Sequence, residues 1–183
     1  MLCERCKYYK EGRCSDPKDF ENEYGEPCCR YMEGAHPAKQ CRNAVVFDID
    51  GTLADITHLL RLWNYDRGQF YARLGEAKLI KNTHDLWLAL FANSYIDIYF
   101  YTCRPETART ITEKWLKEFE IYGTLLMKPN DDDRPDHEVK WDMLQKEGLT
   151  PDNVLCIIED RTSVVRALRE AGYTVLQCAD GDY

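Results

Sequence analysis

The sequence predicts an α/β domain in which helices cover both faces of a parallel β-sheet. Short apolar runs without polar alternation, such as "AVVF" from Ala44 and "IDIYFY" at 96–101, are separated by segments with helical periodicity. Strands of a parallel sheet have this continuous apolar character because helices bury both of their faces. The chain of 183 residues is long enough for one such domain and a small appendage.

The predicted elements alternate along the chain after the first strand. Further strands are expected at 124–127, 154–158 and 173–178, and helices at 105–120, around 136–147 and at 162–172. Pro105 suits the first turn of a helix, and Gly172 suits a C-terminal stop. The segment 53–93 interrupts this order with three helical patterns, of which the last is expected to cover the sheet. The earlier part, about 53–82, is expected to form a small helical cap insertion above the strand ends.

Residues 1–42 differ from the rest of the chain. They contain six of the nine cysteines, several Gly and Pro residues, and no helical or strand periodicity. Clustered cysteines in a cytoplasmic protein suggest metal binding rather than disulfides. A tetrahedral Zn²⁺ site would fit Cys3, Cys6, Cys14 and Cys28, with Cys29 as an alternative to Cys28 and neither Cys41 nor His36 excluded. An iron–sulfur cluster and free thiols are the other readings. We therefore expect a Cys-rich metal-binding module at 1–42 and the α/β domain at 43–183.

The distribution of charge restricts the function. The net charge is −8, and because residues 1–42 contain eight basic and eight acidic residues, the whole acidic excess lies in 43–183. A sequence-independent nucleic-acid binder normally has the opposite sign, so any contact with nucleic acid should be local. No run of eighteen apolar residues is present, and the first residues lack the apolar segment of a signal peptide. We expect a soluble, cytoplasmic protein without membrane contact.

Charged and polar residues follow each predicted strand. They are Asp48 and Asp50 after the first, Thr102 and Arg104 after the second, Lys128 after the third, and Glu159 and Asp160 after the fourth, with Lys140 on a nearby helix. Parallel sheets gather reacting groups at the carboxyl ends of their strands. Carboxylates for a hard cation and basic groups for phosphate oxygens are typical of Mg²⁺-dependent phosphoryl transfer.

Other interpretations of "DIDG" are weaker. A calcium loop starting at Asp48 would need Gly and Glu where the chain has Leu53 and Leu59, and no Gly-rich run ending in Lys-Ser/Thr forms a P-loop. The remaining alternative is a pair of solvated loop aspartates.

Four motifs resemble those of the haloacid dehalogenase (HAD) superfamily: "FDIDGT", "YTCRP", Lys140 and "IIEDR". Residues 44–183 look closest to the 3′-phosphatase domain of phage polynucleotide kinase-phosphatases. The stretch "KPNDDDRPDHEVK" and the tail "EDRTSVVRALREAGYTVLQCADGDY" carry this closer resemblance. It implies a HAD-type Rossmann-like parallel sheet with helices on both faces and a small helical cap insertion.

The resemblance implies a role for each matching residue. Asp48 would be the nucleophile that forms an aspartyl-phosphate, and Asp50 the general acid that later activates water. Asp48, Asp160 and the backbone carbonyl of Asp50 would hold Mg²⁺, with Glu159 as a further candidate ligand. The phosphoryl oxygens would be bound by Thr102, Arg104, Lys128 and Lys140. Lys128 stands where the family usually has Arg, so the planar fork of a guanidinium is missing there.

The implied activity is Mg²⁺-dependent phosphomonoester hydrolysis, with a terminal 3′-phosphate on DNA or RNA as the favoured substrate. A nucleotide or small-molecule phosphatase with the same motifs is the first alternative. A non-catalytic binding scaffold is the alternative of another class. The expected partners are nucleic-acid 3′ ends or nucleotides as substrates. The Cys-rich module either recruits a nucleic-acid end or a partner protein, or is only a structural staple.

Several residues near these motifs have simpler interpretations. Arg134 and Asp136 form either a surface ion pair or a substrate contact. Thr162 is expected to cap the helix that follows it. Trp115 and Trp141, at helical spacing, are expected in the core.

Overall fold

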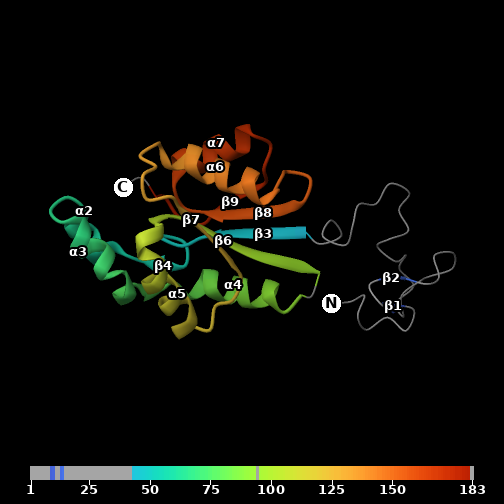
Figure 1. Cartoon of the computed structure of the whole chain (residues 1–183), viewed down its shortest axis with the longest axis horizontal. Coiled ribbons are helices and arrows are strands. Elements are labelled where there is room, and N and C mark those ends of the chain that lie inside the picture. Colours follow the sequence, from blue (N-terminus) through green and yellow to red (C-terminus); the bar gives the residue numbers. More distant parts are fainter. Residues whose placement is uncertain (1–8, 11–12, 15–42, 94, 182–183) are drawn as a thin grey trace.

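The computed structural model describes residues 9–10, 13–14, 43–93 and 95–181 (Figure 1). In the first part of the chain, β1 (Tyr9–Lys10) pairs antiparallel with β2 (Arg13–Cys14). The expected metal ligands Cys3, Cys6, Cys28 and Cys29 lie outside the described residues, and of Cys14 only the backbone is described. The Cys-rich module therefore stays a prediction. In the described part of the chain, no helix is long and apolar enough to cross a membrane.

A five-stranded parallel sheet forms the centre of the domain, as the apolar runs predicted. Its strands are β3 (Asn43–Asp48), β6 (Ile96–Pro105), β7 (Thr124–Lys128), β8 (Val154–Glu159) and β9 (Val175–Gln177), in the order β7-β6-β3-β8-β9. Neighbouring strands all pair in parallel. The first strand of the sequence thus lies in the middle, between β6 and β8. Its carboxyl end is surrounded by the ends of its neighbours.

Helices cover both faces of the sheet, as expected for strands without polar alternation. α4 (Lys81–Phe91) and α5 (Arg109–Glu118) lie on one side, and α6 (Asp136–Glu147) and α7 (Thr162–Glu170) on the other (Figure 1). Successive residues of β3 point to opposite faces. Val45 and Phe47 accordingly belong to the core cluster under α4 and α5, whereas Val46 belongs to the cluster under α6 and α7.

The second crossover differs from the expected one. β6 continues to Pro105, whereas the sequence pattern placed a strand end at 101 and a helix start at 105. A 3₁₀ turn, η4 (Glu106–Ala108), then leads into α5. The longer strand pairs with β7 through an irregular register between Thr102 and Pro105. This irregularity lies beside the polar residues at the end of β6.

Two predictions about side chains on the helices are wrong. Trp115 is buried as expected, but Trp141 is 43% exposed. α6 packs on the sheet through Val139, Met143 and Leu144, so a residue two positions after Val139 points to the opposite side. Thr162 does not cap α7. Arg161 occupies the cap position, and the Thr162 hydroxyl instead accepts a hydrogen bond from Gln177 Nε2 at 3.2 Å.

The segment between β3 and α4 forms the expected small insertion. It contains β4 (Ala54–Asp55), η2 (Thr57–Leu59), α2 (Leu60–Trp63), α3 (Arg67–Ala72), η3 (Leu74–Glu76) and β5 (Lys78–Leu79). β4 and β5 pair antiparallel at the base of the insertion. This pair was not predicted, because two-residue strands are too short to show a pattern. α2 and α3 lie beyond the carboxyl ends of the sheet strands (Figure 1).

The insertion is attached to the domain by apolar and polar contacts. Leu59, Phe70 and Leu74 are buried in the core cluster under α4 and α5. The indole Nε1 of Trp115 on α5 donates a buried hydrogen bond of 2.8 Å to the carbonyl of Ala77. The indole of Trp115 therefore ties α5 to the carbonyl of Ala77 in the insertion.

We expect Trp115→Phe to destabilise the protein by about 1–3 kcal/mol, because the buried carbonyl of Ala77 loses its donor. Urea unfolding followed by circular dichroism measures this. The matched control is Trp141→Phe, which changes an exposed indole and should alter the free energy of unfolding by no more than about 0.5 kcal/mol. Equal effects of the two substitutions would contradict the anchoring role of Trp115.

Candidate active site

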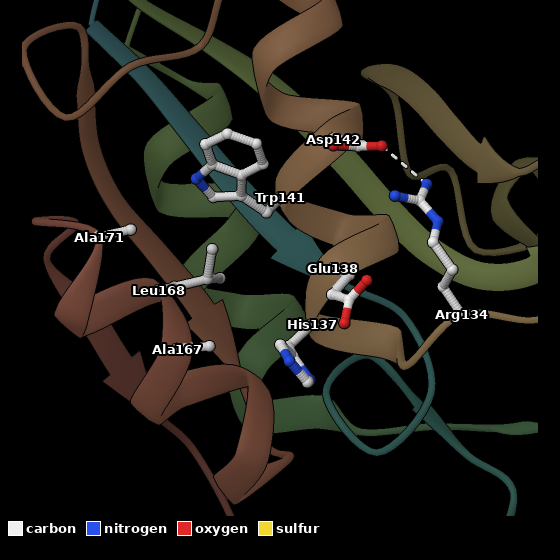
Figure 2. A pocket seen from close by; sticks show the side chains of 8 residues that line it. All are labelled: Arg134, His137, Glu138, Trp141, Asp142, Ala167, Leu168 and Ala171. Carbon is white, nitrogen blue, oxygen red and sulfur yellow. Dashed lines mark hydrogen bonds and ion pairs between the residues drawn. The ribbon is translucent and has the colours of Figure 1, made fainter.

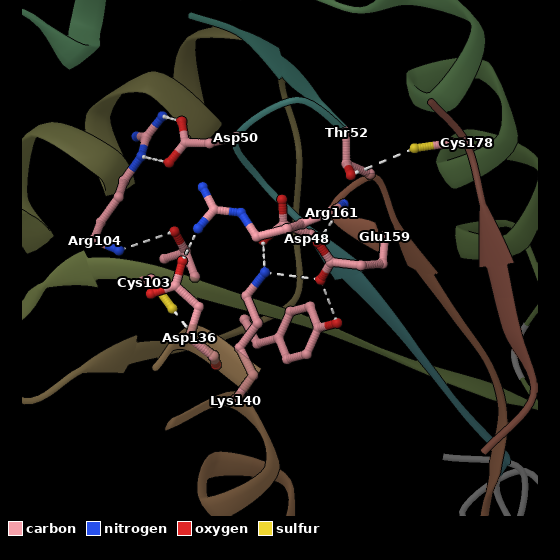
Figure 3. Close-up of polar contacts among 12 residues, drawn as sticks. Asp48, Asp50, Thr52, Cys103, Arg104, Asp136, Lys140, Glu159, Arg161 and Cys178 are labelled. Atoms are coloured by element: carbon pink, nitrogen blue, oxygen red, sulfur yellow. Dashed lines mark hydrogen bonds and ion pairs between the residues drawn. The ribbon is translucent and has the colours of Figure 1, made fainter. Parts of the chain in front are cut away.

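The polar residues after the parallel strands lie together at one edge of the sheet (Figure 3). Asp48 ends β3, Thr102 and Arg104 lie near the end of β6, and Glu159 ends β8 with Asp160 following it. These side chains and that of Lys140 are all classed as buried. The predicted convergence at the carboxyl ends of the strands is therefore present in the structure.

Lys140 is the centre of the buried charge cluster. Its Nζ donates to Asp48 Oδ1 at 2.6 Å and to Glu159 Oε2 at 2.7 Å. The two carboxylates come from neighbouring strands β3 and β8, whereas the lysine comes from α6. Ion pairing with Asp48 and Glu159 raises the pKa of Lys140 well above its ordinary value, although burial acts in the opposite direction. Lys140 therefore carries its positive charge inside the site.

Glu159 is held by two further donors. The hydroxyl of Tyr101 donates to Glu159 Oε2 at 2.6 Å, and the backbone N–H of Arg161 donates to Oε1 at 3.1 Å. The Tyr101 ring also lies under the ammonium group, with Lys140 Nζ 4.6 Å from the ring centroid. Both oxygens of Glu159 thus have partners within the protein. These contacts fix its carboxylate beside Asp48.

Three carboxylates form a candidate cation site. Ligand oxygens of Asp48, Glu159 and Asp160 lie within 4.8 Å of one another. Burial raises the pKa of Asp48 well above its usual value, Lys140 lowers it, and the negative charges of Glu159 and Asp160 raise it again. A hard divalent cation would relieve this repulsion, and carboxylate oxygens are its preferred ligands. The residues present therefore fit a Mg²⁺ ion.

The end of the chain closes over Asp160. The N–H of Gly181 donates to the Asp160 carbonyl at 3.0 Å. A Cβ atom at position 181 would lie 2.2 Å from Asp160 Oδ2 and 2.9 Å from its carbonyl carbon. Only a glycine allows this close approach without a shift of Asp160.

Asp50 lies on the turn that follows β3 and is paired with Arg104. Gly51, with φ of +87°, allows the chain to turn back, and the N–H groups of the next residues bond to the carbonyl of Ile49. The guanidinium of Arg104 donates from Nε to Asp50 Oδ2 at 2.9 Å and from Nη2 to Oδ1 at 2.6 Å. Its Nη1 donates to Thr112 Oγ1 at 3.2 Å. Arg104 therefore orients Asp50.

The acidic loop makes different contacts from those expected. Arg134 pairs with Asp132 and Asp142, each at 2.7 Å, and not with Asp136. Asp136, the first residue of α6, instead pairs with Arg161. Lys128 ends β7, but within the described part of the chain no hydrogen bond or ion pair joins it to Asp48. The short sequence distance between Arg134 and Asp136 therefore does not predict the ion pair that Asp136 forms at the start of α6.

Two cavities lie near these residues. One of about 340 Å³ is lined by Asp160 and Gly51 together with Ile56, Leu60 and Ile80 of the insertion and its border. It opens beside the carboxylate cluster and can receive the remainder of a phosphate ester. The other, of about 370 Å³, lies between α6 and α7 around Trp141 (Figure 2). It faces outward from these helices, so it is not the centre of the chemistry.

Sequence reasoning missed Tyr101 and the backbone contact of Arg161, although the charged group after the fourth predicted strand includes the side chain of Arg161. Tyr101 stands in an apolar run and looks like a core residue, and its partner Glu159 is 58 positions away. Arg161 contributes a backbone donor, which no residue pattern marks. Only the pairing of β6 and β8 on either side of β3 brings these groups together.

A parallel sheet with two aspartates after its central strand, a lysine between buried carboxylates and a second acidic pair after β8 defines a phosphatase of the HAD superfamily. Residues 42–183 match the family model described as "Polynucleotide kinase PNKP phosphatase domain". The chain belongs to this family.

Solved structures support the fold. A chain of the "Pnkp1/Rnl/Hen1 RNA repair complex" is 23% identical, with a TM-score of 0.68, over 81% of this chain and 46% of that one. A second "Pnkp1/Rnl/Hen1 complex" is 22% identical, with a TM-score of 0.67, over 98% and 59%. A haloacid dehalogenase-like hydrolase from Streptococcus pneumoniae is 18% identical, with a TM-score of 0.51, over 75% and 84%. The chain thus spans about half the length of the two complex subunits. No curated protein sequence matches it.

We expect opposite effects on stability from two changes in the cluster. In EDTA, Lys140→Met should destabilise the protein by about 3–5 kcal/mol, because Asp48 and Glu159 keep buried charges without their counterion. Asp48→Asn should stabilise it by about 1 kcal/mol, because a neutral side chain removes the cost of burying a charge, which is the main cause of the raised pKa of Asp48, and also the repulsion from Glu159 and Asp160. Urea unfolding measures both, and destabilisation by Asp48→Asn would contradict the proposed repulsion.

Proposed function

We propose that this protein is a Mg²⁺-dependent phosphatase that removes a terminal 3′-phosphate from polynucleotides through an aspartyl-phosphate. One observation carries the proposal: Asp48, Asp160 and Lys140 form a buried cluster at the carboxyl ends of β3 and β8 in a member of this phosphatase family. The residues that would hold Mg²⁺ are Asp48, Asp160 and the backbone carbonyl of Asp50, with Glu159 as a further candidate. The cation would neutralise negative charge on the phosphate and on the attacking carboxylate.

Asp48 is the nucleophile. Its carboxylate oxygen attacks phosphorus, an O–P bond forms, and the bond between phosphorus and the 3′-oxygen of the sugar breaks. Asp50 donates a proton to that leaving oxygen. Asp50 then takes a proton from a water molecule, whose oxygen attacks phosphorus, releasing inorganic phosphate and regenerating Asp48. The pairing with Arg104 holds the Asp50 carboxylate in place for both steps.

The phosphoryl oxygens are bound by Thr102 and Lys140, which lie at the ends of β6 and on α6. Lys140 already contacts the nucleophile, so a phosphate at Asp48 comes within its reach. The guanidinium of Arg104 donates hydrogen bonds to Asp50 and Thr112, which supports a role in positioning Asp50. Lys128, at the end of β7 beside β6, is a further candidate for binding the phosphoryl oxygens.

The choice of substrate rests on the family. The family model is that of a polynucleotide kinase phosphatase domain, and one of the two similar complex structures is described as an RNA repair complex. Because this chain spans only part of those subunits, the substrate is argued from the phosphatase domain alone. The cavity beside Asp160 has apolar walls from Ile56, Leu60 and Ile80, which suit a nucleoside as leaving group.

Phosphate release tests this function. With Mg²⁺, we expect an oligonucleotide with a 3′-phosphate to be hydrolysed with a kcat/KM at least about tenfold above those of 3′- and 5′-mononucleotides. Equal or better turnover of mononucleotides would contradict the polynucleotide assignment and support a nucleotide phosphatase. Release from none of them would support the scaffold alternative.

Asp48→Asn should lower kcat by at least about 10⁴-fold, because an amide is a poor nucleophile. The folded state of the variant is checked by urea unfolding. Acid quenching during turnover should trap phosphate on the wild-type protein but not on this variant. A folded, active Asp48→Asn protein would exclude Asp48 as the nucleophile.

The close contact at Gly181 gives a test of the cation site. Gly181→Ala should raise the Mg²⁺ concentration for half-maximal activity by roughly tenfold, because a Cβ atom displaces Asp160 Oδ2. Gly75→Ala is the matched control, since its Cβ would meet Ile111 at an ordinary 3.4 Å. An unchanged Mg²⁺ requirement in Gly181→Ala would argue against Asp160 as a ligand.

A further inference from the structure

The insertion carries an exposed group of aromatic and cationic side chains that the chemistry does not use. We propose that this insertion patch, formed by Arg61, Trp63, Tyr65 and Arg67, binds the single-stranded nucleotides that precede the 3′-phosphate. The inference rests on the proposed function and adds to it that the substrate is a single-stranded polynucleotide end. The patch lies on α2, on α3 and on the turn between them.

The aromatic residues of the patch are not needed for the core. Tyr65 is 89% exposed and Trp63 is 38% exposed, whereas Leu59, Phe70 and Leu74 bury the apolar side of the insertion. Tyr65 and Trp63 therefore expose ring surface that the core does not use. Exposed rings on the helix that borders the cavity beside Asp160 are suited to a ligand with flat apolar faces.

Trp63 is held in a geometry suited to stacking. The guanidinium carbon of Arg67 lies 4.5 Å from the centroid of the Trp63 ring. Phe70 and Tyr71 contact the indole in edge arrangements, with centroids 5.2 and 6.1 Å away. An indole fixed by such neighbours loses little freedom when a base stacks on it or on the guanidinium. Proteins that bind single strands use aromatic rings and Arg planes in this way.

The charge of the patch is opposite to that of the chain. The whole chain has a net charge of −8, but residues 56–72 contain two arginines and one aspartate. That aspartate, Asp66, is used within α3, where it accepts hydrogen bonds from the backbone and side chain of Gln69. Among the described residues, no carboxylate forms an ion pair with Arg61 or Arg67. Their charges are thus available to phosphodiester groups.

The insertion connects the patch with the reacting groups. Leu60 begins α2 and lines the cavity beside Asp160, and Trp63 ends the same helix one turn later, about 5 Å along its axis. On α3, Tyr71 contacts Trp63 on one side. A strand whose 3′-phosphate is at Asp48 can therefore reach the patch with its next nucleotides.

These features favour a single strand over a duplex or a protein. Stacking on Trp63 or Tyr65 needs bases that are free of a complementary strand. Protein interfaces also use aromatic and Arg side chains, so the choice of occupant rests on position: the patch lies one helical turn from the cavity beside Asp160. An acidic domain with one local cationic patch can bind a strand at its end without binding nucleic acid along its length.

The test uses the full chain and a DNA oligonucleotide of about ten residues, a length within the usual site size. Binding of its 3′-hydroxyl form is measured by fluorescence anisotropy, and kcat/KM is measured for the 3′-phosphate form and for a 3′-mononucleotide. The variants are Tyr65→Ala, Arg61→Gln and Arg67→Gln, all at exposed positions. Tyr122→Ala and Lys117→Gln are matched controls, because both residues are exposed near the amino ends of the strands.

We expect Tyr65→Ala to weaken oligonucleotide binding roughly tenfold. Each arginine variant should reduce the slope of log affinity against log salt concentration by about 0.7. The ratio of oligonucleotide to mononucleotide kcat/KM should fall about tenfold in Tyr65→Ala and stay at the wild-type value in both controls.

Equal losses in patch variants and controls, or an unchanged ratio in all variants, would overturn the inference. The inference would also be overturned if the wild-type protein hydrolysed the oligonucleotide and every patch variant bound it with unchanged affinity. That outcome would favour a protein partner at the patch. Failure of the proposed function is distinguishable, because it gives no phosphate release from either substrate. In that case the affinities of the wild-type protein and the patch variants for the 3′-hydroxyl strand, measured by anisotropy, still test whether the patch binds a single strand.

Discussion

The contact of Lys140 with Asp48 and Glu159 is the interaction on which the site depends. It joins α6 to the central strand β3 and to β8, and through Glu159 and Tyr101 it reaches β6. A buried ammonium group between two buried carboxylates is tolerable only with short contacts to both. The register of the three central strands and the placement of α6 on them are therefore constrained by the same few atoms that face the phosphate.

This arrangement has an energetic consequence. Asp48, Glu159 and Asp160 supply three negative charges where Lys140 supplies one positive charge, so the isolated cluster is strained by repulsion. The apolar clusters on both faces of the sheet offset this strain and hold the carboxylates together. Such strain is expected at a site whose charge balance is completed by a cation and an anionic substrate. Stability and chemistry therefore make opposite demands on Asp48.

The sequence predicted regular elements better than individual contacts. α6 occupies 136–147 as predicted, and the five apolar runs correspond to the five sheet strands, because periodicity over many residues averages out local exceptions. Trp141, Thr162 and Arg134 were assigned wrong neighbours, because a side chain's partner depends on the rotation of its helix and on distant segments. The positions of Asp48, Asp50 and Asp160 at strand ends could be predicted because acidic residues follow apolar runs there in the sequence. Tyr101 carries no such mark.

The sheet and the insertion have different roles, and this difference reconciles the acidic net charge of the chain with the proposed anionic substrate. The proposed substrate is a polyanion, whereas the chain is strongly acidic and its reacting cluster is itself rich in carboxylates. The carboxyl ends of the strands supply chemistry that suits any phosphate ester, so selection among substrates falls to the segment that lies above them. That segment combines exposed aromatic rings with two arginines that form no ion pair among the described residues. Under the proposed function, acidity elsewhere would limit binding to the strand end, where a terminal phosphate would be recognised.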